Sequence, residues 1–544
     1  MSLERLNRHQ RPIAKRIIVR GTLILDTPTC LGSGDADSPT DLAILRDSIS
    51  DHALLTGSSI AGALRNYLRE YERGYGKEEQ KTDRATSLFG GTRRDDDGEQ
   101  SPLIVNDAIS SKIPTVELRD GVEIEGTTGT AKKGHKYDLE LLAARTEFSL
   151  CFELLIEQKQ DPREQLNYED RLVKSLALAL RGLELGEISM GMKKRRGFGR
   201  CHVDKWQVWE FNLSDESDRT AWLLFERECT KSPVITNKIT DALGVVLNEG
   251  EDQRDRFTID ATFKLASPLL IRSGQAETGC APDVVHLKSA RIINEVKYFL
   301  ASCLRQQMFS QAIAWLNLLP QEITVWTSEN LELFLLAYFL LQPSRSKLPI
   351  LSGTSLVGVL RHRAERIVNT LKKPTTIIDE IFGPDFSQDK TKQAKASRLI
   401  VHESVIENTA ELVQTRIAID RFTGGAYHGA LFQEQPVFAN DETELKLEIE
   451  LRNPIEHEIG LLLLLLKDLW TEDLPVGGGS SVGRGRLKGK KATMTWKDSI
   501  WEIEKNGDNF LKITPEIEKG KLETYVSELA NYLKENNNNE PSNS

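Results

Sequence analysis

LLTGSSIAGALRNYL (residues 54–68) and ILSGTSLVGVLRHRA (residues 350–364) are two copies of one pattern within a single chain. At a constant offset, both stretches carry Gly, Ser, Gly, Leu and Arg at matching positions. An ordered series of such matches indicates an internal duplication, and the chain is therefore interpreted as two tandem repeats. Three more matches keep the same order along both repeats, namely 16–34 with 256–274, 116–129 with 413–426, and 191–200 with 477–486.

The length and composition favour a soluble protein of several domains. A chain of 544 residues is too long for one hydrophobic core and scales to roughly two to four domains. We expect no signal peptide and no membrane span, because no run approaches about 18 apolar residues. The six cysteines are scattered singly, which argues against a zinc ribbon or a disulfide framework and predicts a cytoplasmic protein. Because the net charge of the chain is −10, any binding of nucleic acid would have to depend on local basic patches.

The repeats divide the chain into four parts. The first repeat domain covers residues 1–210, and the second covers residues 252–500. The polar and acidic stretch 211–251 predicts a linker between them. The extra segment 290–345 has helical periodicity and predicts a helical insertion in the second domain. Residues 501–544 predict one amphipathic helix followed by a disordered polar tail.

Each repeat predicts the same order of elements: strand, loop, helix, strand, polar excursion, strand, helix, strand. Strands that alternate with helices and end in paired antiparallel runs indicate an α+β fold of ferredoxin type. The excursions after Arg119 and Arg416 are too polar and too rich in glycine for a core, so we expect two-stranded ribbons that project from the body. On such a ribbon Phe422 or Tyr427 could stack on a base, and the plainer alternative is a disordered surface loop.

Hydroxyl residues stand at the start of both repeated helices. The plainer interpretation is that they only cap the helix. A helix N-terminus with free N–H groups is also a phosphate site, and the recurrence of the whole unit favours contact with a nucleic-acid backbone. Arg65 and Arg361 lie two turns further along the same helices and are included in this prediction. The hydroxyl residues concerned are Ser58, Ser59, Thr354 and Ser355.

Two glycine-rich loops, GMKKRRGFGR (191–200) and GGGSSVGRGR (477–486), carry basic side chains at equivalent points of the repeats. A basic run on its own is usually a solvated surface. A basic, glycine-rich loop that recurs after a helix favours contact with phosphates without reading of bases. The residues predicted to contact RNA here are Lys193, Lys194, Arg195, Arg196, Arg200, Arg484, Arg486 and Lys488.

Carboxylates follow the first glycine loop of each repeat. Asp35, Asp37, Asp41 and Asp47 lie in the first repeat, and Asp283 lies in the second. The plainer interpretation is a flexible acidic loop. The functional interpretation is a carboxylate that binds Mg²⁺ or orients the 2′-hydroxyl of an RNA for attack on its neighbouring phosphate. Weaker candidates, for acid/base chemistry, are His52, His286 and His428.

Together these elements resemble the RAMP superfamily, and more narrowly the backbone subunit of type III CRISPR effector complexes. The resemblance rests on LLTGSSIAGALR and LPILSGTSLVGVLR, the Gly loops with their downstream Asp, the excursions and the terminal basic Gly loops. The short stretches LFGG (88–91) and IFGPD (381–385) also match this family. Two copies in one chain are similar to the fused double backbone subunit of type III-D systems.

The resemblance implies a fold and a function. Each repeat would have an RRM-like palm and a thumb ribbon, with guide CRISPR RNA along the palms. The thumbs would kink the guide–target duplex, with Arg119, Arg416 and Phe422 among the RNA-binding residues. The catalytic and metal-binding residues would be Asp41 and Asp283, which cleave target RNA with Mg²⁺ or another divalent ion and the 2′-hydroxyl as nucleophile. The further partners would be other Cas effector subunits, with no membrane.

Three alternatives stay open at this point. The chain is a guide-holding scaffold if neither aspartate is active, since some family members keep the fold without cleavage. It is a guide-processing endoribonuclease of the same superfamily if histidines cut without metal. It is a structural α+β protein without RNA if the repeated motifs are only architectural. Asp37 is the reserve for Asp41 within its acidic loop.

Overall fold

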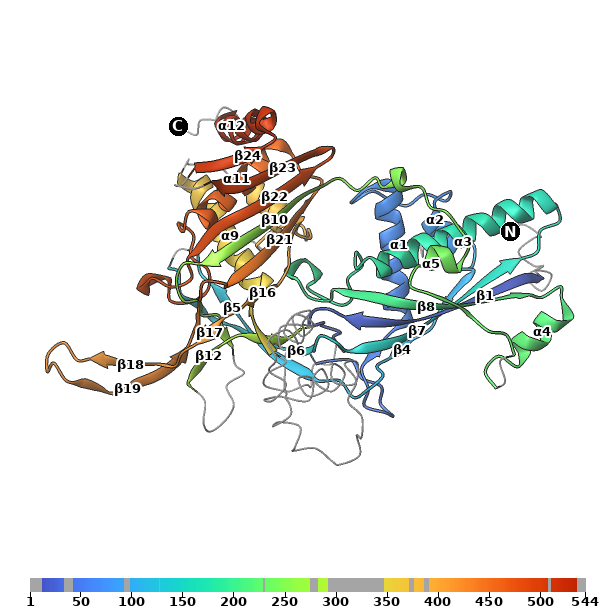
Figure 1. Ribbon diagram of the computed structural model, residues 1–544, viewed down its shortest axis with the longest axis horizontal. Coiled ribbons are helices and arrows are strands. Elements are labelled where there is room, and N and C mark those ends of the chain that lie inside the picture. The colour runs from blue at the N-terminus through green and yellow to red at the C-terminus, as the bar shows by residue number, and fades with distance from the viewer. Residues whose placement is uncertain are drawn as a thin grey trace, which may run out of the picture.

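Two α+β units, one for each repeat, make up the body of the molecule (Figure 1). Asp41, nearly all of the predicted insertion 290–345 and the predicted tail lie outside the described residues. The computed structural model describes residues 12–33, 43–91, 98–126, 128–227, 230–273, 282–291, 347–370, 376–385, 391–506 and 510–535.

The first unit is an antiparallel sheet in the order β3-β7-β1-β8-β9. Alternate residues of its central strand, such as Ile17, Val19 and Leu23, are buried beneath the helices. This alternation is the pattern of a sheet with one face on the core. The strands are β1 (Ile13–Leu25), β3 (Leu103–Val105), β7 (Glu147–Glu157), β8 (Cys201–Asn212) and β9 (Val234–Thr236), and the helices are α1 (Gly57–Arg73), α2 (Arg84–Phe89) and α3 (Pro162–Glu184).

The second unit repeats this arrangement within a larger antiparallel sheet, in the order β13-β14-β16-β21-β10-β22-β23-β24 with β15 beside β21. Its strands are β10 (Arg256–Leu265), β13 (Lys288–Ala290), β14 (Lys347–Leu351), β15 (Leu399–Val401), β16 (Ser404–Glu407), β21 (Glu444–Arg452), β22 (Leu487–Trp496), β23 (Ser499–Asn506) and β24 (Phe510–Thr514). Its helices are α9 (Gly353–Thr370), α10 (Thr376–Phe382), α11 (Glu456–Trp470) and α12 (Lys519–Glu535).

The strand register of the two units is the same. Arg16 lies opposite Leu155 in the first sheet, and the equivalent Arg256 lies opposite Arg452 in the second. The central strand of each sheet also shifts register at the equivalent place, after Gly21 in β1 and after Thr262 in β10. The duplication and the ferredoxin-type α+β fold predicted from the sequence are therefore confirmed.

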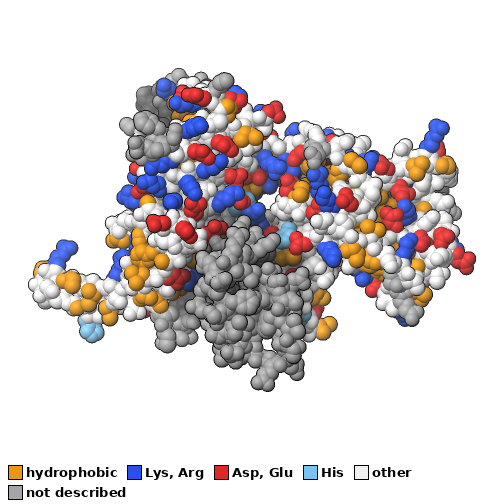
Figure 2. Space-filling view, viewed as in Figure 1, with side chains coloured by type: hydrophobic (Ala, Val, Ile, Leu, Met, Phe, Trp, Pro, Cys, Tyr) orange, Lys and Arg blue, Asp and Glu red, His pale blue; other side chains and the backbone are white. Residues whose placement is uncertain are grey.

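Both excursions form two-stranded ribbons, as predicted. In the first repeat β5 (Val116–Ile124) pairs with β6 (Ala131–Leu142). In the second, β18 (Gln414–Ile419) pairs with β19 (Ala426–Gln435) and projects from the body (Figure 1). Apolar side chains line this ribbon (Figure 2), and Phe422 at its tip is 95% exposed.

Shorter pairs complete the fold: β2 (Leu54–Leu55) with β4 (Ala108–Ile109), β11 (Arg272–Ser273) with β12 (Val284–His286), and β17 (Ala410–Glu411) with β20 (Val437–Phe438).

Two segments hold more structure than the sequence indicated. The stretch 211–251, predicted as a linker between the repeats, holds α4 (Glu216–Leu223), β9 and α5 (Ile239–Ala242). Trp222 and Phe225 pack on the first sheet and give this polar stretch a small core of its own. After residue 500, β23 and β24 extend the second sheet before α12, with Trp501 fully buried. Among the described residues, no helix combines the length and hydropathy that a membrane span requires.

Candidate nucleic-acid interface

The helix starts are capped two or three positions earlier than predicted. The Thr56 Oγ1 accepts from the Ser59 N–H at 3.3 Å and caps α1, and the Ser352 Oγ accepts from the Ser355 N–H at 3.3 Å in the same way. Ser58 and Ser59 are exposed in the first turn, but the Ser59 N–H is taken by the Thr56 cap and the Gly57 N–H donates to the Asp107 carboxylate at 2.6 Å. Their capping role is therefore wrong, and what the first turn of α1 exposes to a ligand is the two serine side chains.

Arg65 and Arg361 each hold a loop of the protein itself. Arg65 binds Glu79 through two hydrogen bonds of 3.0 and 2.8 Å and donates to the Gly90 carbonyl at 2.9 Å. Arg361 donates to the Gly383 carbonyl at 2.8 Å. Both glycines belong to the short LFG-type stretches quoted above, so the repeated Arg and the repeated glycine form one structural unit. This geometry favours a structural role for the two arginines over contact with phosphates.

The glycines of the basic loops are needed for backbone packing. The loops contain the short 3₁₀ turns η2 (Lys194–Arg196) and η4 (Ser480–Val482). A Cβ on Gly199 would lie 1.9 Å from the Met190 carbonyl oxygen, and a Cβ on Gly485 would lie 1.9 Å from that of Val476. Both glycines also have positive φ, +79° and +78°. The chain itself therefore requires these glycines for its own backbone, whatever the side chains of the two loops contact.

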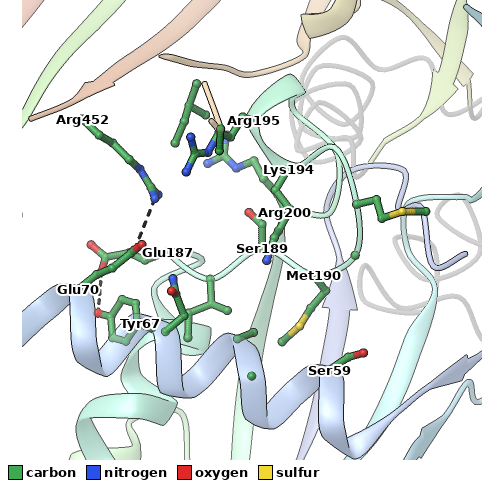
Figure 3. A pocket seen from close by; sticks show the side chains of 18 of the residues that line it. Ser59, Tyr67, Glu70, Glu187, Ser189, Met190, Lys194, Arg195, Arg200 and Arg452 are labelled. Carbon is green, nitrogen blue, oxygen red and sulfur yellow. Dashed lines mark hydrogen bonds and ion pairs between the residues drawn. The ribbon is translucent and has the colours of Figure 1, made fainter. Parts of the chain in front are cut away.

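A groove of about 1300 Å³ runs between the two units, and residues from both line it. Arg452, Arg195 and Lys194 lie across from α1, which carries Ser59 and Glu70 (Figure 3). The lining has nine Lys or Arg side chains against three Glu, and Asp252, Glu448 and Glu458 pair with some of these cations from outside the lining. Cations still exceed carboxylates, although the chain as a whole is acidic. The nine cations are Arg69, Lys194, Arg195, Arg200, Arg254, Arg256, Lys395, Arg398 and Arg452.

Several of these cations lack full compensation by carboxylates. Burial and the nearby positive charge of Arg452 lower the pKa values of Arg195 and Lys194, although Glu70 acts in the opposite direction. Burial also lowers the pKa of Arg196, with Arg361 adding to the effect. A cation whose charged form is disfavoured in this way gains when an anion enters, because the anion restores the lost interactions. The wall around η2 is therefore suited to phosphate.

Arg119 does not face this groove. It is 5% exposed, and its guanidinium binds Glu403 of the second repeat at 2.6 Å and Glu117 at 3.2 Å. Burial lowers the pKa of Arg119 and the two carboxylates raise it, with a net rise. The prediction that Arg119 contacts RNA is not supported by this position, since the residue joins the two repeats. Arg200 also joins them, through Glu448 at 2.7 Å, but stays partly exposed in the groove.

The basic residues of the second repeat divide into two groups. Arg484 is buried and binds Glu434 at 2.9 Å, and Arg416 reaches the same carboxylate at 3.2 Å. These two fix the base of the ribbon β18–β19. Arg486 and Lys488 are exposed and remain available to a ligand. The matching loop of the first repeat is much more basic, so the two repeats present different chemistry at one structural position.

Asp283 lies at the base of the ribbon β18–β19. Its side chain is exposed, and its Oδ2 accepts from the Gln433 N–H at 2.7 Å. Asp41 is outside the described residues. Its position is bracketed, however, because Ile44 pairs with Gly32 as His286 pairs with Arg272. Asp41 and Asp283 both stand three residues before that pairing, which favours Asp41 over Asp37 as the counterpart of Asp283.

A metal ion fits at Asp283 only in part. The described residues contain no group of three or more His, Cys, Asp or Glu side chains that could hold a metal. One carboxylate oxygen of Asp283 is engaged by backbone and the other is not paired with a cation in the described structure. Mg²⁺ commonly takes one or two carboxylates together with phosphate oxygens of its substrate. One exposed carboxylate could hold a divalent ion only if phosphate oxygens of an RNA supplied further ligands.

The candidate acid/base histidines have different surroundings. His286 is 2% exposed; its Nδ1 accepts from the Ile271 N–H at 3.1 Å, and its Nε2 donates to the Ile350 carbonyl at 3.0 Å. Burial lowers the pKa of His286 to about 4. It is thus a structural residue that ties three segments together, and a role in proton transfer to RNA is not supported. His52 lies against the Ser110 carbonyl at 2.6 Å, and His428 is exposed on β19.

The pH dependence of stability should report on His286. Because its pKa is lower in the folded protein than the usual 6.5, unfolding takes up a proton between about pH 6.5 and pH 4, and stability falls as the pH falls through this range. The full effect is roughly 3 kcal/mol. We expect His286→Gln to be less stable than the wild type at pH 7.5 and to show a smaller loss on acidification in thermal unfolding. Equal losses in both proteins would contradict this.

Comparison with known families agrees with the geometry. A model of the RAMP superfamily matches residues 22–202 and 262–488, one region in each repeat. The chain belongs to the RAMP superfamily. Membership indicates a CRISPR-associated, RNA-binding role, and the paired regions agree with a tandem of two RAMP domains. No curated protein matches the sequence significantly.

Proposed function

We propose that this chain is a double backbone subunit of a type III CRISPR effector complex, similar to the fused subunits of type III-D systems. In this role it binds the guide CRISPR RNA and cleaves the complementary target RNA. The observation that carries the proposal is the groove between the repeats with its excess of cations, which has the start of α1 on one wall and the η2 loop on the other. The superfamily match supports the RNA-binding part.

The groove is suited to the backbone of an RNA and not to its sequence. Its cations would bind phosphates, and contacts of this kind fix position without reading bases. A guide whose sequence differs from one complex to the next requires such contacts. The exposed ribbon β18–β19, with Phe422 at its tip, would insert its apolar face against the bases of the guide–target duplex.

Cleavage is assigned to Asp283 and to Asp41. The 2′-hydroxyl of the target gives its proton to water and its oxygen attacks the adjacent phosphorus. The bond to the 5′-oxygen of the next nucleotide breaks and that oxygen takes a proton from water, so a 2′,3′-cyclic phosphate and a 5′-hydroxyl result. A divalent ion bound by the aspartate and the phosphate would supply charge stabilisation. The aspartate itself holds its place through the Gln433 N–H, which ties it to the base of the ribbon. This arrangement couples the predicted cleavage position to the ribbon that distorts the duplex.

One alternative retains specific support. The exposed carboxylate of Asp283 belongs to no group of three or more possible metal ligands among the described residues, which also suits a guide-holding scaffold without cleavage. The guide-processing alternative has less support, because His286 is buried and bound on both sides.

The groove predicts the salt dependence of RNA binding. The double change Lys194→Glu and Arg195→Glu should weaken binding of guide RNA at least tenfold at physiological salt. It should also reduce the slope of log K against log salt by about 0.7 for each lost contact with a single strand. The matched control is Lys174→Glu with Lys238→Glu, which changes the charge equally but lies outside the groove lining. Filter binding over a salt series measures both, and equal slopes for the two variants would exclude the groove as the binding path.

A further inference from the structure

The three glutamates that line the groove are held to different degrees. Glu187 accepts a hydrogen bond from Arg254 at 2.9 Å, and Glu450 accepts one from the Arg452 Nε at 3.0 Å within its own strand. Glu70 has a longer contact, 3.4 Å from its Oε2 to the Arg452 Nη1. Within the described part of the chain, the Glu70 side chain makes no other hydrogen bond or ion pair. Glu70 is therefore the lining carboxylate that a ligand would displace most easily.

Glu70 faces the cations that we expect to bind phosphate. It projects from α1 into the groove, and Arg452, Arg195 and Lys194 lie across from it (Figure 3). Burial lowers the pKa values of Lys194 and Arg195, and the negative charge of Glu70 acts against this fall in both. One carboxylate of repeat one thus acts on a cation of repeat two and on two cations of the η2 loop. A carboxylate and a phosphate bind a guanidinium through the same kind of charged hydrogen bond.

The fold of the repeat does not require an acidic residue at this position. The counterpart of Glu70 at the matching position of α9 is Arg366, which is exposed and has the opposite charge. Arg452 would also keep partners if Glu70 moved away, because Glu450 lies at 3.0 Å and the Tyr75 ring lies 4.4 Å from its guanidinium. The charge of Glu70 is therefore explained better by what enters the groove than by the packing of its helix.

We propose that Glu70 is an internal competitor for the phosphate site formed by Arg452, Lys194 and Arg195, and that it thereby determines which anions the groove accepts. A phosphate that binds to Arg452 must first displace the carboxylate, which is tethered and so has a high effective concentration. An RNA strand that makes many phosphate contacts tolerates this fixed cost. A short oligonucleotide or a free phosphate makes too few contacts to do so. This inference rests on the proposed function, in which the groove binds guide RNA.

The variant Glu70→Gln tests the proposal in the full-length chain, because it removes the charge and nearly keeps the shape. We expect guide RNA to bind about fivefold tighter, as the lost competitor is one partly exposed ion pair. The slope of log K against log salt should become steeper by about 0.7, since a phosphate then gains a contact without releasing a carboxylate. A short RNA oligonucleotide should gain by a similar factor. Filter binding over a salt series measures all three quantities.

Two further variants separate a local effect from a general effect of charge. Glu164→Gln changes the net charge equally, but Glu164 is exposed at the start of α3 and lies outside the groove lining, so neither affinity nor slope should change. Arg452→Gln should weaken binding of guide RNA. In that background Glu70→Gln should have a smaller effect than in the wild type, because the two charges no longer meet.

Three results would overturn the inference. They are unchanged affinity and slope in Glu70→Gln, weaker binding in Glu70→Gln, and an undiminished effect of that change in the Arg452→Gln background. A lower unfolding temperature of Glu70→Gln with unchanged affinity would make Glu70 a structural residue that joins the repeats. The double change Lys194→Glu and Arg195→Glu distinguishes failure of the proposed function. If that change leaves guide binding intact, the groove is not the guide path; if it weakens binding while Glu70→Gln has no effect, only the role of Glu70 is removed.

Discussion

Asp283→Ala should abolish one of the cleavages of target RNA in the guide-loaded complex while guide binding stays unchanged. Asp283 presents an exposed carboxylate at the base of the ribbon β18–β19, where a divalent ion could join it to a phosphate of the target. Loss of the charge stabilisation that such an ion provides is worth several kcal/mol, which corresponds to a decrease of at least about a hundredfold in rate. Denaturing gels of labelled target RNA, with Mg²⁺ and with EDTA, measure the effect.

The first repeat supplies the companion test and its control. Asp41→Ala should remove a different product from the one that Asp283→Ala removes, and the double variant should remove both. Asp47→Ala is the matched control, because the Asp47 carboxylate accepts from the Ser50 N–H and hydroxyl at 2.8 and 2.6 Å and only closes a turn. Unchanged products in all variants would make the chain a scaffold. Cleavage that persists in EDTA would instead favour metal-free chemistry.

The repeated pattern of the sequence was sufficient to predict the α+β fold of the two repeats. Strand alternation, glycine positions and helix starts are local signals, and two copies of each reduce the chance of a wrong assignment. The alternation in RIIVRGTLIL became β1, and the stretch matched to it became β10 with the same register shift. The segment 211–251 was harder to predict, because its few apolar residues become a core only when they meet Ile18 and Trp209 on the first sheet.

The candidate site was only partly predictable, because a side chain's partner is often remote in sequence. Arg119 and Arg65 have the composition of phosphate ligands, yet their carboxylate partners Glu403 and Glu79 are found only in the folded chain. The sequence analysis missed the cations that repeat two contributes to the groove, such as Arg398 and Arg452. Arg398 directly precedes β15 and Arg452 is the last residue of β21, and no local motif distinguishes them from surface arginines.

Glu403→Ala should cause the largest loss of stability among single changes at the boundary between the repeats. The Glu403 carboxylate is fully buried and binds both Arg119 and Arg291, so its removal leaves two buried guanidinium groups with less compensation. Breaking a buried ion pair on one side typically costs about 3–5 kcal/mol. We expect a lower unfolding temperature in calorimetry, and separate transitions for the two repeats if the boundary opens first. Asp120→Ala is the control, since Asp120 pairs at 3.1 Å with the exposed Lys136 and its loss should have no measurable effect. Equal unfolding temperatures for the two variants would show that this buried network does not hold the repeats together.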